Sequence, residues 1–471
     1  MIEQRLHRRA ARRFIHTAFG HEPGPSPQRG GRSLSMLTSS LALVVGKVAT
    51  MAVGFLFWVV AARAFQQSEV GLAAGAVSAV MLCTQLALLG VGSSVILNYP
   101  RHDRDPAPLL DSAFSLVAAA SVLAVAIFFV IAATALHELR VVATDPVFAL
   151  ALVAMSVLGT IGILLDQVST LLRRGDQMLV RALLFGLANV ALLAPVAALS
   201  SGAGAVWIFA TWVGAAAAAV LLGAVQLWRT PLRYRYRPRL RRHLAWPLLR
   251  VGVPNHWLTL TERAPGLILP IIVTELVSPA ANAAWYAAWM MAWVLYIIPI
   301  QVGMTLFAEA ATKTASLTKL IRHGLRSSLV LGVSGAAVVA LIAPQLLSIL
   351  GHRYAEAGST PLRILVLAVV PLTFVQAYFV VCRSTGRLKE GIVTGAIGAS
   401  VSIGGAALAA LESGLVGMAV VWVVTQVVVS VWAVWRLFRL SRASRQIDPV
   451  AVDGIRPEAG PLSAGLAGRG T

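Results

Sequence analysis

The chain has 471 residues, of which 58% are hydrophobic and only 12% are charged, and its formal net charge is +20. Soluble domains carry about 25% charged residues, so this composition excludes a soluble globular protein. It predicts a polytopic all-α membrane protein in which the basic residues lie outside the hydrocarbon.

A basic tail, residues 1–36, comes before the first apolar run. Its segment 20–33 is rich in Pro, Gly and Ser and cannot bury a core. Residues 2–19 allow either a basic amphipathic helix on the inner leaflet or an unstructured topology anchor. The first apolar run is too long for the core of a signal peptide, so we expect it to be a retained helix.

Twelve apolar runs follow, and each is long enough to cross a hydrocarbon core about 30 Å thick, which takes about 20 residues per helix. The predicted membrane helices are 37–62, 70–97, 111–135, 147–171, 179–200, 204–228, 246–276, 281–308, 326–350, 362–382, 390–411 and 414–438. The chain then ends in a tail, 439–471, with a composition similar to that of the first tail.

Most of the 39 Lys and Arg residues fall on one side of this twelve-helix topology. Because basic loops stay in the cytoplasm, both termini are predicted to be cytoplasmic. The loop 233–243, "RYRYRPRLRRH", interleaves Tyr with Arg as some nucleic-acid-binding segments do. Topology explains it better, so we expect contact with anionic lipid headgroups and no nucleic-acid partner. The excess of Arg over Lys indicates a GC-rich bacterium, and hence its plasma membrane.

The second half of the chain repeats features of the first. Segments 171–229 and 381–439 both start with a basic turn containing Gly, have a short glycine-containing turn in the middle, and end in Trp-Arg. A repeat of six helices starts on the same side each time, which predicts two lobes related by a pseudo-two-fold along the membrane normal. The predicted lobes are 37–228 and 246–438, joined by the basic linker 229–245, with a substrate cleft between them.

Sequence signatures of catalysis are absent. The chain has no P-loop, HExxH, GxSxG or CxxC motif, and its outer loops are all short. Cys83 and Cys382 lie inside apolar runs, without metal-ligand spacing. We therefore expect no enzyme activity, no metal and no cofactor, apart from coupling to H⁺ or Na⁺.

The segment "HWLTLTERAPGLILP" (256–270) places Glu262 and Arg263 within an apolar run. Charged residues at membrane depth cost roughly 2.5–3.5 kcal/mol each on insertion scales and normally face a bundle interior or water. Neighbours in sequence lie about 100° apart on a helix and do not face each other. At least one of the two is therefore expected to meet a partner on another helix or a wet cavity.

The same helix has further polar positions. Asn255 and Thr259 share a stripe with Glu262, and His256 lies with Arg263 on an adjacent face. Pro265 removes a backbone hydrogen bond and is expected to kink the helix. A polar, kinked helix that opens the second lobe is typical of a transport pathway. The alternative is a structural Glu–Arg pair that joins helices and never touches a substrate.

Two further charges are candidates for function. Lys47 lies about ten residues into the first run, so it either faces the cleft or snorkels to the inner interface. Asp166 lies near the inner end of the fourth run, where it is either an ion-coupling group or an interfacial carboxylate. The patterns Gly71/Gly75 and Gly391/Gly395 are GxxxG motifs that favour close helix packing, here within the chain.

Segment 58–101 resembles the first hairpin of polysaccharide-biosynthesis flippases, the Wzx-like branch of the multidrug/oligosaccharidyl-lipid/polysaccharide exporter superfamily. Its motifs are matched by Ala62-Arg63, Glu69 to Gly71 and Leu89 to Gly92. Its "DR" pair is similar to Glu262-Arg263, with Glu in place of Asp. Its tenth helix and the following turn are similar to 354–371 and 384–391. The resemblance covers most of residues 37–438. It implies a MATE-like fold of twelve helices in two lobes.

The resemblance also implies a function: flipping of a lipid-linked glycan from the inner to the outer leaflet by alternating access. A polyprenyl (pyro)phosphate headgroup is anionic, so Lys47 and Arg263 are expected to attract it, with Asn255, His256 and Thr259 lining the cavity. Glu262 and Asp166 are the candidates for ion coupling. Glycosyltransferases or a polymerase of a polysaccharide pathway are the expected partners.

Three other functions stay open. One is a drug or small-cation antiporter on the same fold, which needs a net acidic cleft. The second is a membrane-embedded glycosyltransferase or polymerase, which usually needs a sizeable catalytic outer loop. The third is a transport-inactive scaffold of a glycan-assembly complex.

Overall fold

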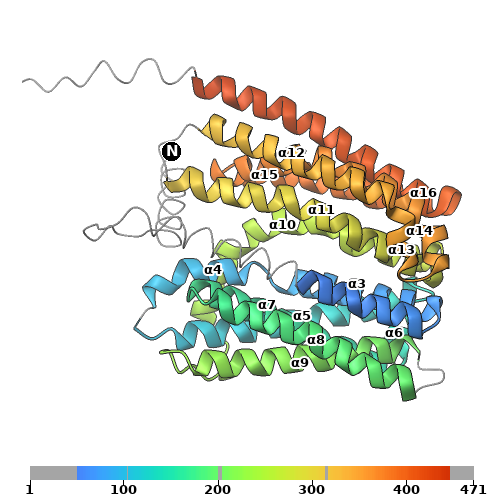
Figure 1. The fold of residues 1–471 in the computed structure, drawn as a ribbon. Coiled ribbons are helices and arrows are strands. Elements are labelled where there is room, and N and C mark those ends of the chain that lie inside the picture. Colours follow the sequence, from blue (N-terminus) through green and yellow to red (C-terminus); the bar gives the residue numbers. More distant parts are fainter. Residues whose placement is uncertain (1–49, 103, 200–203, 313–316, 446–471) are drawn as a thin grey trace, which may run out of the picture.

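The computed structural model describes residues 50–445, apart from 103, 200–203 and 313–316 (Figure 1). Within these ranges the structure is helical, without strands, and nine helical segments are long and apolar enough to cross a membrane. They are Gln67–Arg101, Ala107–Ala135, Pro146–Leu171, Gly175–Ala198, Ala205–Trp228, Pro279–Val302, Gly324–Leu341, His352–Ser384 and Leu388–Leu440. A shorter apolar helix, Thr50–Ala64, precedes them. The protein is a multi-pass all-α membrane protein, as the composition predicts.

Residues 50–228 form the first half of the helix bundle. After the helix Thr50–Ala64, its elements are α3 (Gln67–Ala87), α4 (Val91–Asn98), η1 (Tyr99–Arg101), α5 (Ala107–Ala135), α6 (Arg140–Thr144), α7 (Pro146–Leu171), α8 (Gly175–Leu199) and α9 (Ala205–Trp228). The predicted run 70–97 is thus divided between α3 and α4. Gly90, with φ of 69°, supplies the left-handed conformation that separates them.

Residues 242–445 form the second half. Its elements are α10 (Arg242–Leu276), α11 (Pro279–Thr312), α12 (Leu317–Leu341), α13 (Ala343–Ser348), α14 (His352–Leu365), η2 (Val366–Ala368), α15 (Val369–Ser384) and α16 (Leu388–Arg445). The predicted run 326–350 breaks because Pro344 has no N–H to continue α12 and instead begins α13. Runs 390–411 and 414–438 both lie in α16, which bends at Gly414, where φ is 56°.

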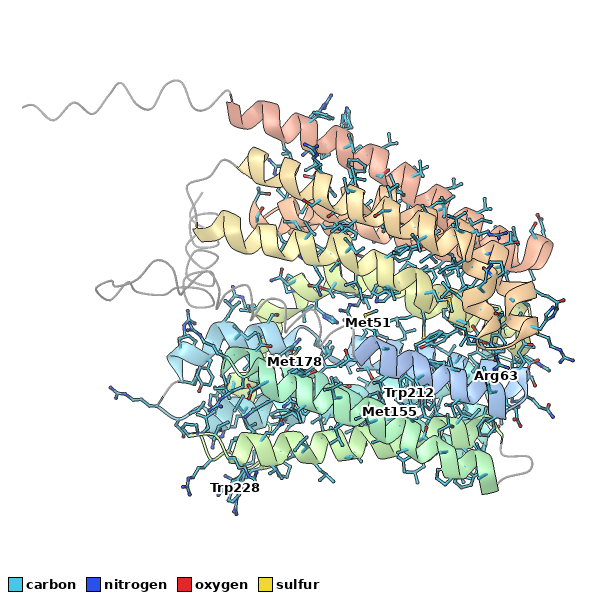
Figure 2. All side chains as sticks on the ribbon, viewed as in Figure 1. Met51, Arg63, Met155, Met178, Trp212 and Trp228 are labelled. Atoms are coloured by element: carbon cyan, nitrogen blue, oxygen red, sulfur yellow. The ribbon has the colours of Figure 1, made fainter. Side chains whose placement is uncertain are left out.

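The two halves lie as two layers of roughly parallel helices (Figure 1). α3 of the first half packs against α10 and α11 of the second. We call the end of the bundle that carries the loops 99–106, 172–174, 229–241 and 385–387 the basic end. Arg63 and Trp228 mark the opposite and basic ends of the first half (Figure 2).

Small residues let α3 approach the second half closely. A side chain at Gly71 would lie 1.6 Å from the Pro279 carbonyl oxygen, and one at Gly75 would lie 2.7 Å from the Thr274 hydroxyl. The Asn282 amide donates a 2.8 Å hydrogen bond to the Gly71 carbonyl. Without a hydrophobic driving force in lipid, such backbone-to-backbone packing is what holds membrane helices together. The close internal packing predicted from the first GxxxG pattern is confirmed.

α10 belongs to both halves. Near its start, Leu248 is fully buried in a hydrophobic cluster with Val91 and Leu109 of the first half. Further along, Leu258 is fully buried with Tyr378 and Cys382 of the second half. The helix therefore crosses from one half to the other over the turns between these two leucines, which contain Gly252 and Pro254.

Candidate functional site

The polar residues of α10 lie where the two halves meet. Asn255 and Arg263 are exposed, whereas His256, Thr259 and Glu262 are partly buried. The Thr259 hydroxyl donates to the Asn255 carbonyl oxygen at 3.4 Å, so it is turned toward its own helix. Thr259, Glu262 and His256 each have a defined partner, and the partners of Glu262 and His256 show which neighbouring helix each side chain faces.

Glu262 forms an ion pair with Arg383 at the end of α15. One guanidinium nitrogen of Arg383 donates to the Glu262 carboxylate at 2.8 Å, and the side chains of Arg383 and Glu262 are 24% and 15% exposed. A partner on another helix is one of the two surroundings expected from the sequence, a wet cavity being the other, since Arg263 lies about 100° from Glu262 around the helix. The pair lies within the second half and joins α10 to α15.

His256 points toward the first half. Its Nε2 lies 2.7 Å from the carbonyl oxygen of Gln85 on α3. Arg263 follows His256 by seven residues and therefore lies within about 20° of the same helix face. Within the part of the chain that the structure describes, Arg263 makes no hydrogen bond and no ion pair. An exposed guanidinium without a hydrogen bond or ion pair in the described ranges, on the same helix face as His256, is the main chemical feature of this site.

α10 and α3 contact each other on both sides of Arg263. They touch at His256 and Gln85, and again at Thr274 and Gly75. Between these contacts α3 advances ten residues, about 15 Å of helix, and α10 advances eighteen, about 27 Å. The α10 segment between the contacts is therefore the longer one, and it contains prolines 265 and 270, which commonly bend a helix. Arg263 lies on this segment.

Asp166 belongs to another polar cluster, inside the first half. Arg181 of α8 donates to Asp166 of α7 at 2.7 and 3.2 Å, to the Gln226 side-chain oxygen of α9 at 2.6 Å and to Ser169 at 2.9 Å. Arg181 is only 4% exposed, so this network ties three helices together near the basic end. No hydrogen bond or ion pair joins Asp166 to the polar face of α10. Lys47 lies outside the described residues.

The second half has a related cluster at the same end. Arg436 holds the carboxylate of Glu390 through two nitrogens, at 2.5 and 3.0 Å, and the Tyr378 hydroxyl donates to it at 3.2 Å. In the first half one cation, Arg181, donates to several acceptors. In the second half one acid, Glu390, accepts from several donors. Asp166, Glu262 and Glu390 are therefore each held by an arginine.

Sequence analysis missed the partners Arg383 and Arg181. Both lie close to the end of a predicted membrane run and look like residues of a basic loop. No spacing along one helix reveals an ion pair between two helices. The sequence gives one signal only: a carboxylate at membrane depth requires a cation nearby, and neither Glu262 nor Asp166 has one facing it on its own helix.

A carboxylate also links the halves at the opposite end. Glu275, at the end of α10, accepts hydrogen bonds from the backbone N–H groups of His137, Glu138 and Leu139, at 2.7, 3.1 and 2.7 Å. Arg63 crosses between the halves in the other direction and donates to the carbonyl oxygens of Ser348 and Ile349. These contacts fasten the two halves together at this end.

No family profile matches the sequence, and no curated protein matches it either. Solved structures do match the fold. An inward-facing MATE-family multidrug resistance transporter of the MOP superfamily aligns with a TM-score of 0.64 at 16% identity, covering 84% of this chain and 96% of that one. The lipid II flippase MurJ, in an inward closed conformation, aligns with a TM-score of 0.64 at 11% identity, covering 84% and 87%.

A third structure, a MOP superfamily transporter from Pyrococcus furiosus described with a binding pocket of reversed polarity, aligns with a TM-score of 0.61 at 14% identity, covering 91% of this chain and 98% of that one. This chain thus has the fold shared by these MATE transporters and the MurJ flippase.

Proposed function

We propose that the protein is a membrane transporter that moves a lipid-linked saccharide with an anionic polyprenyl (pyro)phosphate headgroup from the inner to the outer leaflet by alternating access. It would act in a bacterial plasma membrane with both termini cytoplasmic, alongside glycosyltransferases or a polymerase of a polysaccharide pathway. The fold supports a transporter, and the Wzx-like sequence features support this class of cargo.

The observation that carries the proposal is the charge on α10 facing the first half. Arg263 is exposed there with no ion-pair partner among the described residues, whereas Glu262 is neutralised by Arg383 and Asp166 by Arg181. A guanidinium binds phosphate strongly and with a defined geometry. An exposed guanidinium without an ion-pair partner therefore favours an anionic headgroup over a cationic drug.

Glu262 and Asp166 remain the candidates for ion coupling. Each carboxylate would have to leave its arginine before it could bind H⁺ or Na⁺. For Glu262 the exchange has a natural trigger, because an incoming phosphate would compete with it for the nearby guanidinium groups. Asn255, His256 and Thr259 lie on the same helix and would contact the saccharide, with Lys47 adding a second cation.

The experiment is a leaflet-translocation assay. Purified protein is reconstituted into vesicles that contain a fluorescent polyprenyl-pyrophosphate-linked saccharide, and the fraction bleached by an external reductant is followed with time. We expect Arg263→Ala to slow translocation at least tenfold and Arg263→Lys to retain part of the rate. Arg250→Ala removes another exposed arginine of α10 and serves as the matched control with a rate near wild type.

Wild-type translocation in the Arg263→Ala variant would overturn the role of Arg263. If the protein instead moved a fluorescent organic cation against a proton gradient and left the lipid-linked saccharide in place, it would be a drug antiporter. Absence of both activities in a folded, reconstituted protein would favour a transport-inactive scaffold.

A further inference from the structure

The segment between the two halves, residues 229–241, begins with a turn at 229–232, continues without regular secondary structure and is fixed to the start of α5. We call it the linker. The Tyr234 hydroxyl donates to Asp111 at 2.8 Å, and the backbone N–H of Arg237 donates to the same carboxylate oxygen at 3.0 Å. The N–H of Arg241 donates to the hydroxyl of Ser112 at 3.3 Å. Two adjacent residues of α5 thus hold three points along the linker.

The tyrosines of the linker face α5. Tyr234 is buried and stacks on Phe114, with ring centroids 6.1 Å apart. The hydroxyl of Tyr236 lies 3.1 Å from that of Ser115. Burial, together with the Asp111 carboxylate, raises the pKa of the Tyr234 phenol, which favours the protonated form that donates this hydrogen bond.

Arginines alternate with these tyrosines along the sequence. All are exposed, and none forms an ion pair within the described ranges; they are Arg233, Arg235, Arg237 and Arg239, continued by Arg241 and Arg242. Because two side-chain and two backbone hydrogen bonds hold the linker on α5, these like charges are also held close together. Their mutual repulsion favours the binding of an anionic partner.

Exposed tryptophans set the level of this surface in the membrane. Trp228 and Trp246 flank the linker and are 42% and 68% exposed. Indole rings favour the headgroup layer, since they are apolar with one polar N–H. Arg235 lies over the Trp228 ring, 5.6 Å from its centroid. The arginines of the linker therefore lie at the level of lipid headgroups.

We propose that the linker is a binding surface for anionic phospholipid headgroups. Their phosphates pair with the linker arginines, which form no ion pair with a carboxylate in the described ranges. The site lies at the surface of the basic end and is independent of the transport function proposed above. A nucleic acid could bind the same arginines. Anionic lipids are favoured because the arginines are held at headgroup level between Trp228 and Trp246. Each basic residue near an anionic membrane surface strengthens binding by about fivefold.

The test measures binding of fluorescent phosphatidylglycerol to the full-length protein in neutral detergent micelles, with phosphatidylcholine as the uncharged comparison. The variant Arg235→Gln/Arg239→Gln removes two charges and no backbone bond. We expect it to weaken phosphatidylglycerol binding by about 25-fold and to leave phosphatidylcholine binding unchanged. The matched control, Arg140→Gln/Arg353→Gln, removes two exposed arginines from the opposite end and should change binding by less than twofold.

A second variant, Asp111→Ala, tests whether the fixed geometry matters. Release of the linker is detected as faster cleavage by trypsin, which cuts after arginine, and lipid binding should weaken even though no positive charge is lost. The proposal is overturned if the double variant binds phosphatidylglycerol like wild type. It is also overturned if a single-stranded oligonucleotide displaces the lipid at equal concentration, or if a released linker binds as tightly as a fixed one.

Discussion

Leu248 and Leu258 lie ten residues apart on α10, yet they are buried in the cores of different halves. Any movement of one half relative to the other must therefore change the helix between them. This short segment contains Gly252 and Pro254 together with the first polar residues of the candidate site, 255 and 256, and the other three follow directly after it. Movement of the halves and the position of Arg263 are thus connected through a single helix.

Gly252 is expected to tolerate no side chain. A Cβ there would lie 2.5 Å from the Gly90 carbonyl oxygen, which is backbone and cannot turn aside. Gly252→Ala should push the halves apart and destabilise the protein by about 1–3 kcal/mol, measured as thermal unfolding in detergent. Gly404→Ala is the control, because no atom lies within 4 Å of its Cβ. Equal melting temperatures for the two variants would show that the Gly90–Gly252 approach is not tight.

The Glu262–Arg383 pair should behave as a unit. Removing one member leaves a largely buried charge without its partner, which costs about 3–5 kcal/mol, whereas removing both leaves none. We expect Glu262→Gln and Arg383→Gln each to lower the unfolding temperature strongly and the double variant to recover much of the loss. A double-mutant cycle on thermal unfolding measures the coupling. Additive losses would mean that the two side chains act separately.

The Asp166–Arg181 pair is predicted to respond unequally to mutation. The Asp166 side chain is 41% exposed and can be hydrated when its partner is removed, whereas Arg181 is buried. Asp166→Ala should therefore cost about 3 kcal/mol or more, and Arg181→Met about 1 kcal/mol, in the same unfolding assay. The opposite order would indicate that the bonds of Arg181 to Gln226 and Ser169 hold the three helices without the acid.

Glu275 is predicted to protect three backbone amides from exchange. Hydrogen exchange measured by mass spectrometry should be faster at residues 137–139 in Glu275→Ala, with Glu275→Gln intermediate because its amide keeps one acceptor oxygen. Glu138→Gln removes a nearby charge but no acceptor of these bonds and should exchange like wild type. Unchanged exchange in Glu275→Ala would rule out this contact between the halves in solution.

The sequence alone predicts the membrane class and the location of most helices, because hydropathy is a local property of the chain. It does not place the break at Pro344. It also does not show that the first turns of α10 pack on the first half, since Leu248 and Leu258 look alike in sequence. Burial partners depend on tertiary packing, which a hydropathy pattern does not contain.

The candidate site is predicted in part for the same reason. The polar positions of α10 are visible as interruptions of an apolar run, and the need for a partner follows from the cost of burying Glu262. The identity of that partner, Arg383, depends on how α15 ends beside α10. The two contacts of α10 with α3, on either side of Arg263, also depend on tertiary packing and are not visible in the sequence.

Because α10 packs on both halves, it affects where the gene could be divided. A cut after residue 241 would leave the C-terminal fragment with an apolar segment around Leu248 whose burial site is on the N-terminal fragment. Two fragments made from separate plasmids should therefore recognise each other in the bilayer and rebuild one particle, as in split-protein complementation. In the sequence α10 looks like the first helix of an independent lobe. In the divided protein it would instead hold the two fragments together.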